Sequence, residues 1–211
     1  MSKYIVRRFI FMEKKNNKSL RAWEIAALMA LSLFLCAGTW AQARQQSISS
    51  ALVRLHVIAV SDDEEEQEIK LQVRDAVLGY LTPVLEGADS AQEARQIISG
   101  HMEEIAQAAG AAAQGRQVSV TLSRENYPTR EYEGFTLPAG RYESLRVILG
   151  EGQGHNWWCV VFPPLCLTAV QAEAVQRVMS GEDIAIVTEE EGYELRFRLI
   201  ELWGELMNAL S

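Results

Sequence analysis

Apolar residues first gather in one uninterrupted run near the start of the chain. This run extends from Ile25 to Trp40 and has no polar side, whereas a surface helix of a globular domain normally has one. Basic residues precede it, namely Lys14, Lys15, Lys18 and Arg21. The small residues Ala41 and Ala43 follow it at the spacing that a signal peptidase recognises. We therefore predict a signal peptide or membrane anchor over residues 1–43, with Ala43 as the candidate cleavage position.

The fate of this leader stays open. As a helix, residues 25–43 would be about 28 Å long at 1.5 Å per residue, which is just enough to cross a bilayer. A cleaved signal peptide and an uncleaved anchor both fit. Residues 44–50 are polar and without pattern, which predicts a short tether. Residues 51–211 are expected to form a single exported domain.

After the tether, the apolar spacing alternates between that of strands and that of helices. Val53, Leu55 and Val57 recur at every second position, as in a strand with one buried face. Ser61 and the acidic residues that follow it predict a helix start, and Pro83 predicts its end or a kink. The sequence of residues 90–93 is typical of a capping box and predicts a second helix that extends toward Gly115.

The second half of the chain predicts more strands and a final helix. Strands are expected at 118–122, 142–149 and 157–162, with residues 150–154 as the hairpin loop between the last two. A helix is expected at 168–179, strands at 184–187 and 193–197, and an amphipathic helix at 199–210. Because strands and helices come in blocks, we predict an α+β sandwich with a mostly antiparallel sheet and helices packed on it.

Charge excludes several classes of partner. The leader holds seven of the 20 basic residues and two of the 28 acidic ones, so the exported part is strongly acidic. Such a surface repels nucleic-acid phosphates and anionic lipid headgroups. We therefore expect no nucleic-acid partner, and membrane contact only through an uncleaved N-terminal segment. The acidic run at 62–68 lacks the glycine and ligand spacing of a calcium loop, and the glycines at 150–154 precede a strand rather than a helix. No metal or cofactor is expected.

Two cysteines lie close together beyond the leader. Cys159 and Cys166 flank a Pro-Pro bend, and an oxidising compartment favours a disulfide between them. Buried thiols, or a zinc site completed by His56 and His155, are alternatives. A cysteine-dependent cell-wall or peptide hydrolase would use Cys159 with one of these histidines as base. Because no residue is evident that would orient the imidazole, we expect no catalytic residue and no enzyme.

The most unusual local sequence contains adjacent tryptophans. Trp157 and Trp158 are consecutive on a predicted strand, so their side chains point to opposite faces of the sheet. A sheet buried on one side would cover only one of them, which leaves the other for a second segment or a partner. Tryptophan and arginine are frequent at binding hot spots. The candidate partner contacts are Arg130, Tyr142, His155, Asn156, Trp157 and Trp158.

Four segments together resemble stage II sporulation protein R. They are Leu55-His-Val-Ile-Ala59, Lys70-Leu-Gln-Val-Arg-Asp-Ala-Val-Leu78, Leu137-Pro-Ala-Gly-Arg-Tyr142 and Asn156-Trp-Trp-Cys-Val-Val-Phe-Pro-Pro-Leu-Cys166. The resemblance implies a protein made in the forespore and exported into the space between the two membranes. There the family activates a membrane-embedded aspartic protease of the mother-cell membrane, which cleaves the precursor of the early mother-cell sigma factor.

The resemblance covers residues 52–167, with a weaker echo at 196–201. Its signature falls on Arg54, His56, Arg74, Asp75, Asn156, Trp157, Trp158, Cys159 and Cys166. It implies no catalytic role for any of them. Val60-Ser61 stands where the family usually has Asn-Ser, and Ser61 keeps the helix cap. Arg74 and Asp75 are adjacent on a predicted helix and do not face each other, so we expect each to pair elsewhere.

Overall fold

The computed structural model describes residues 20–132, 135–164, 178–188 and 194–210. Its elements are α1 (Ala22–Ser50), β1 (Val53–Ile58), α2 (Glu64–Leu85), α3 (Ala91–Gly100), α4 (Met102–Ala112), β2 (Val118–Tyr127), β3 (Arg130–Tyr132), β4 (Phe135–Leu137), β5 (Gly140–Leu149), β6 (Asn156–Phe162), α6 (Gly181–Val187) and α7 (Glu194–Leu210). The chain divides into two compact units, residues 1–37 and residues 38–211. The second unit contains the sheet, and the mixture of helices and strands confirms the predicted α+β class.

The main sheet has four strands in the order β2-β5-β1-β6. β1 pairs parallel with β5 and antiparallel with β6, while β2 and β5 are antiparallel. The predicted hairpin between β5 and β6 is therefore wrong, because β1 lies between these strands. Their loop instead crosses the end of β1, where the Gly154 amide donates to the Ala59 carbonyl at 3.0 Å. A Cβ on Gly154 would lie 2.2 Å from the Ser61 carbonyl oxygen, so the crossing requires glycine at this position.

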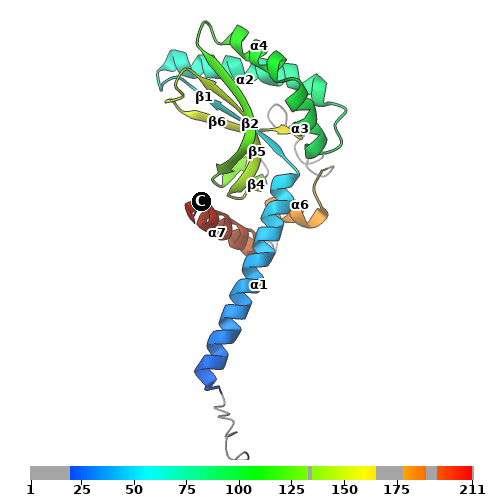
Figure 1. Ribbon diagram of the computed structural model, residues 1–211, viewed down its shortest axis with the longest axis vertical. Coiled ribbons are helices and arrows are strands. Elements are labelled where there is room, and N and C mark those ends of the chain that lie inside the picture. The colour runs from blue at the N-terminus through cyan, green and yellow to red at the C-terminus, as the bar shows by residue number, and fades with distance from the viewer. Residues whose placement is uncertain (1–19, 133–134, 165–177, 189–193, 211) are drawn as a thin grey trace, which may run out of the picture. The chain divides into compact units, whose positions relative to one another are not determined.

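Helices α2, α3 and α4 cover one face of the sheet (Figure 1). The alternating residues Val53, Leu55 and Val57 of β1 point into this layer and are fully buried. Their burial agrees with the period-two pattern of the sequence. The expected second helix is divided into α3 and α4 at His101, directly after Gly100. Glycine is a weak helix former, and the His101 ring is held by the Tyr80 hydroxyl at 2.7 Å.

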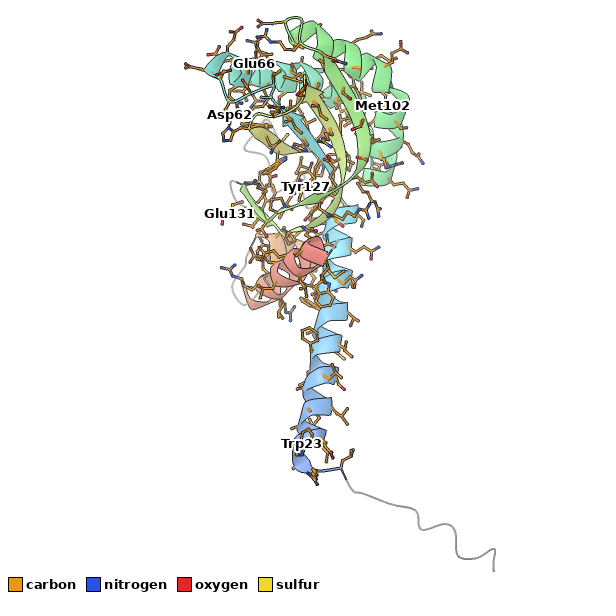
Figure 2. The ribbon with its side chains drawn as sticks, turned by 60° about the vertical axis from the view of Figure 1, so that its left-hand side comes forward. Trp23, Asp62, Glu66, Met102, Tyr127 and Glu131 are labelled. Carbon is orange, nitrogen blue, oxygen red and sulfur yellow. The ribbon has the colours of Figure 1, made fainter. Side chains whose placement is uncertain are left out.

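The other face of the sheet carries a second core. The end of α1, the β3–β4 hairpin, α6 and α7 all contribute to it. Figure 2 places Tyr127 and Glu131 toward this end of the domain, and Glu66 and Met102 toward the helical layer. Fully buried members of this core are Ile48, Leu52, Leu137, Tyr142, Ile186, Val187 and Ile200. The domain is thus a sheet with packed residues on both sides.

The C-terminal part differs from the sequence prediction. Residues 184–187 and 194–197 are helical in α6 and α7 rather than strands. Ser180 explains the first case, because its hydroxyl accepts from the Asp183 amide at 3.2 Å and caps α6. That cap outweighs the strand preference of Ile184 and Ile186. The final amphipathic helix is confirmed as α7, and most of the helix expected at 168–179 falls outside the described residues.

Residues 44–50 form the last two turns of α1 rather than the expected tether. Arg44 pairs with Glu182 of α6 at 2.6 Å, and Ser47 donates to the Asp183 carboxylate at 2.7 Å. Ile48 is fully buried in the second core. These polar residues therefore dock on α6, and hydrophobic spacing alone gives little indication of such docking. The packed domain begins before residue 44, since Ala41 is only 2% exposed.

Candidate partner-contact surface

A chain of hydrogen-bonded side chains crosses all four strands on the sheet face opposite α2. His56 contacts the Glu125 carboxylate through Nδ1 at 3.2 Å and the Asn156 side-chain oxygen through Nε2 at 3.0 Å. Ser144 donates to the same Glu125 oxygen at 2.7 Å. The Tyr127 hydroxyl lies 2.7 Å from the Ser144 hydroxyl. We call these five residues the cross-sheet network.

The carboxylate of Glu125 is the centre of this network. Burial alone would raise the pKa of Glu125, but the hydrogen bonds from His56 and Ser144 and the nearby positive charge together outweigh that effect. Arg146 adds a favourable charge, with its Nη1 3.3 Å from the second carboxylate oxygen. The pKa of Glu125 therefore lies below its ordinary value of 4.5. At neutral pH the carboxylate is ionised and accepts hydrogen bonds from Ser144 of β5 and His56 of β1.

Arg54 lies beneath the network and is fully buried. Its guanidinium carbon is 3.9 Å from the ring centroid of Tyr127 and 4.9 Å from that of Tyr142. It also donates a hydrogen bond to the Tyr132 hydroxyl. Aromatic faces compensate a buried cation through cation–π attraction. Burial raises the pKa of the Tyr127 and Tyr142 hydroxyls, so these phenols stay neutral around the charge.

The two tryptophans lie on opposite faces of β6, as their adjacency predicts. Trp158 is half-buried, and the Arg130 guanidinium carbon lies 3.7 Å from its ring centroid. Trp157 packs toward the helical layer, where Arg74 of α2 lies 4.4 Å from its ring centroid. Each ring is therefore covered by an arginine of the same chain. Arg74 also pairs with Asp75 at 2.7 Å, so the expectation that these two pair elsewhere is wrong.

The accessible part of this side of the domain is a polar and aromatic surface. We call it the open face, made of His56, Arg130, Arg146, Asn156 and Trp158. Asn156 is exposed at the start of β6. The others are half-buried, so each still presents some surface to solvent.

The remaining candidate contacts lie elsewhere. His155 is exposed and bound to Asp62 at the start of α2, through its ring and through its amide at 2.6 Å. Trp157 belongs to the helical side. Tyr142 is fully buried, and its hydroxyl donates to the Pro138 carbonyl at 2.6 Å, so it supports the core and is not accessible to a partner.

Sequence reasoning did not single out Glu125, Ser144 or Arg146 as site residues. The available signal was the alternation within β5, where Ser144 and Arg146 interrupt the apolar positions Leu145 and Val147. Polar residues on the second face of a central strand need partners when that face is covered. The partner on β2 depends on strand order, which alternation within one strand does not reveal.

The cysteine geometry gives no support to a nucleophile. Cys159 is 5% exposed, faces the helical layer and is disulfide-bonded. His56 lies on the opposite face of the sheet, and His155 is bound to Asp62. Cys166 falls outside the described residues, so its pairing with Cys159 stays a prediction. Among the described residues, no group of three or more histidine, cysteine or acidic side chains is placed to hold a metal.

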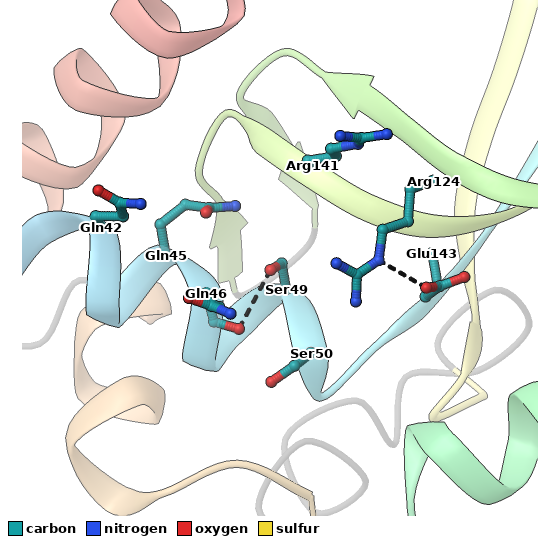
Figure 3. Close-up of a pocket in the computed structure, with 8 residues that line it drawn as sticks. All are labelled: Gln42, Gln45, Gln46, Ser49, Ser50, Arg124, Arg141 and Glu143. Atoms are coloured by element: carbon teal, nitrogen blue, oxygen red, sulfur yellow. Dashed lines mark hydrogen bonds and ion pairs between the residues drawn. The ribbon is translucent and has the colours of Figure 1, made fainter.

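Two cavities elsewhere in the domain do not resemble catalytic clefts. One, of about 190 Å³, is polar and lies between the end of α1 and strands β2 and β5 (Figure 3); its lining residues are Gln42, Gln45, Gln46, Ser49, Ser50, Arg124, Arg141 and Glu143. Its Arg124 and Glu143 form an ion pair at 2.7 Å. The other, of about 780 Å³, is lined mainly by the end of α2 and the residues around Pro163. Among the described residues, no histidine or cysteine lines either cavity, so these residues offer no nucleophile with a base.

Together these features define a class of protein. An α+β domain follows an apolar helix that is long enough, by length and composition, to cross a membrane. That helix suggests a signal or an anchor and is compatible with export. The domain presents a polar and aromatic surface suited to binding another protein.

Comparison with known proteins identifies the family. A family model described as stage II sporulation protein R matches residues 49–172. Stage II sporulation protein R of Bacillus subtilis (strain 168) is 32% identical over 187 residues, covering 76% of this chain and 84% of that protein. No solved structure matches. The chain belongs to the stage II sporulation protein R family, which supports a role in sporulation.

Proposed function

We propose that the chain is an exported sporulation signal that acts by contact and not by catalysis. It activates a membrane-embedded aspartic protease in the mother-cell membrane, which then processes the precursor of the early mother-cell sigma factor. Family membership and the apolar N-terminal helix support this proposal. The protein would act in the space between the forespore and mother-cell membranes.

The open face is the observation that carries the contact mechanism. Asn156 is held by His56, and Trp158 is held beneath Arg130. Side chains fixed before binding lose little conformational freedom on association, which favours affinity. Tryptophan and arginine also contribute strongly at interfaces. We therefore infer that the protease binds at Asn156 and Trp158.

The network beneath this surface explains why it is rigid. Glu125 accepts hydrogen bonds from β5 and contacts His56 of β1, which in turn contacts Asn156 of β6. Each such bond contributes about 1 kcal/mol, and bonds to a charged group contribute about 1.5–3 kcal/mol. Changes in Glu125 should therefore alter the position of Asn156 without touching the partner directly.

Export can be tested separately from contact. Cells that contain the protease and the sigma-factor precursor would produce either the full chain or a chain without residues 1–37. Cleavage of the precursor only with the exported form would support the proposal. Cleavage with the cytoplasmic form would contradict action from outside the membrane. Absence of cleavage with both, while both proteins accumulate, would contradict activation itself.

A further inference from the structure

Helix α7 has apolar residues on two opposite sides. One side packs on the domain through Phe197, Ile200 and Gly204. The opposite side carries a row of leucines spaced three or four residues apart, which places them on one face. These are Leu199, Leu202, Leu206 and Leu210, with exposed fractions of 39%, 61%, 46% and 73%. We call this row the outer stripe.

The outer stripe is unusual for a helix at the surface of a domain. Such a helix normally turns polar residues to solvent once its apolar side is buried. Here one side of α7 already packs closely on the domain, because a Cβ on Gly204 would lie 2.1 Å from the Ala139 carbonyl oxygen. A contiguous exposed apolar row marks a protein or membrane interaction site. The position of α7 in the domain indicates whether this site binds a protein or a membrane.

α7 is held against α1 near the end of the apolar run. A Cβ on Gly38 would lie 2.7 Å from the Trp203 ring, so α7 contacts α1 directly at that residue. Gly38 comes three residues after the last of the large exposed apolar residues in this part of α1, which extend from Trp23 to Leu35. If α1 crosses a membrane, Gly38 lies where the helix leaves it.

The positions of the tryptophans agree with a membrane surface near Gly38. Trp23 and Trp40 are 17 residues apart, which is about 26 Å of helix and close to the roughly 30 Å thickness of the bilayer hydrocarbon. Tryptophan is enriched at both membrane–water interfaces. Trp203, beside Gly38, adds a third tryptophan near the second interface. If α1 crosses a membrane, the contact between Trp203 and Gly38 therefore holds α7 close to the surface of that membrane.

We propose that the outer stripe of α7 binds the lipid surface of the membrane in which α1 is anchored. The flanks of the stripe carry both Arg198 and Glu205, and the exported part of the chain is acidic overall. Binding therefore depends on burial of the leucines and does not require anionic lipid. This contact adds to the N-terminal segment a second point of attachment to the membrane.

The test uses the full chain in phosphatidylcholine nanodiscs, with Cys36→Ser and a nitroxide label at Leu202→Cys. The matched control carries the label at Gln92→Cys, an exposed position on α3. Oxygen partitions into the bilayer and a nickel chelate stays in water, so their collisions with the label report its surroundings. Because Leu202 is largely exposed in the fold, the substitution should leave folding intact, which thermal melting of both proteins verifies.

Lipid contact predicts that the Leu202 label loses access to nickel and gains access to oxygen relative to the Gln92 label. Equal nickel access at both positions would overturn the proposal. Protection of the Leu202 label from both reagents would also overturn it, because a protein would then cover the stripe. A second label at Leu210→Cys, the most exposed leucine of the stripe, should behave like the Leu202 label.

Discussion

Glu125 shows how a single side chain stabilises the open face. The pKa of Glu125 is held below 4.5 in the folded protein because the hydrogen bonds from His56 and Ser144, together with the charge of Arg146, outweigh the cost of burial. A depressed folded-state pKa contributes stability above the unfolded-state pKa, and this contribution is lost as the pH falls through the folded value. The cross-sheet network should therefore become weaker in acid.

Glu125→Gln should lower the free energy of unfolding by about 1–3 kcal/mol at pH 7, because a charged acceptor with several bonds is lost. The difference from the unchanged protein should shrink as the pH falls below 4.5. Urea unfolding of residues 38–211 at several pH values measures both effects. A difference that stays constant down to pH 3 would contradict the assigned pKa direction.

Cys159 and Cys166 give a second test at the scale of residues. If they bond to each other, Cys159→Ser and Cys166→Ser should each lower stability, and the chain-entropy term for so short a loop is about 2.5 kcal/mol. The double variant should lose no more than either single variant. Under reducing conditions the loss should disappear. Different losses for the two single variants would argue against the predicted pair.

The sequence predicted residue faces better than residue partners. The opposite orientation of Trp157 and Trp158 follows from their adjacency, and the structure agrees. The contact between His56 and Glu125 joins residues 69 positions apart, on strands that are not neighbours in the sheet. Local pattern contains no such information. The burial of Tyr142 was missed for the same reason, because β3, β4 and α7 cover its face only in the folded chain.

Among the elements, β1, α2 and most of α7 were predictable from residue spacing, whereas α6 and the start of α7 were not. Short apolar runs such as residues 184–187 fit either a strand or a helix by pattern. The Ser180 cap decides in favour of the helix. Sheet order was also beyond prediction, because a loop of a few residues usually joins neighbouring strands. Here the glycine at 154 lets the chain pass across the end of β1.

The docking of α7 depends on the absence of a side chain at Gly204. Gly204→Ala would place a methyl group against the Ala139 carbonyl oxygen, and such overpacking costs about 1–3 kcal/mol. Gly79→Ala in α2 is the matched control, since no atom lies within 4 Å of its Cβ. The control should raise stability by up to about 1 kcal/mol. Thermal melting of the two variants compares them, and equal shifts would contradict the close approach.

At the scale of the whole molecule, the apolar leader and the domain share one helix. α1 runs from Ala22 to Ser50, and its last turns are packed against the domain. Cleavage after Ala43 would remove Gly38 from Trp203 and Ala41 from the second core. Sequence pattern left cleavage open, and on these contacts we propose that the protein keeps this helix.

A domain that begins at Arg44 should be less stable than one that begins at Gly38. The missing turn contributes the buried methyl group of Ala41 and the cover of Trp203, and each buried carbon contributes about 0.8 kcal/mol. Denaturant unfolding of the two fragments measures the difference. Equal stability would show that residues 38–43 are dispensable to the fold and would favour cleavage at Ala43.

If the open face activates the protease, changes in its exposed side chains should reduce cleavage of the sigma-factor precursor. Precursor cleavage would be followed in cells that produce the protease with the full chain, with Asn156→Ala, or with Gln153→Ala. Gln153 lies in the loop just before β6, is exposed, and its side-chain amide donates to Glu151 of the same loop at 3.0 Å. We predict that Asn156→Ala reduces cleavage while Gln153→Ala leaves it unchanged, with all three proteins exported at equal levels. Full cleavage with Asn156→Ala would contradict the account, because the open face would then not be where the partner binds.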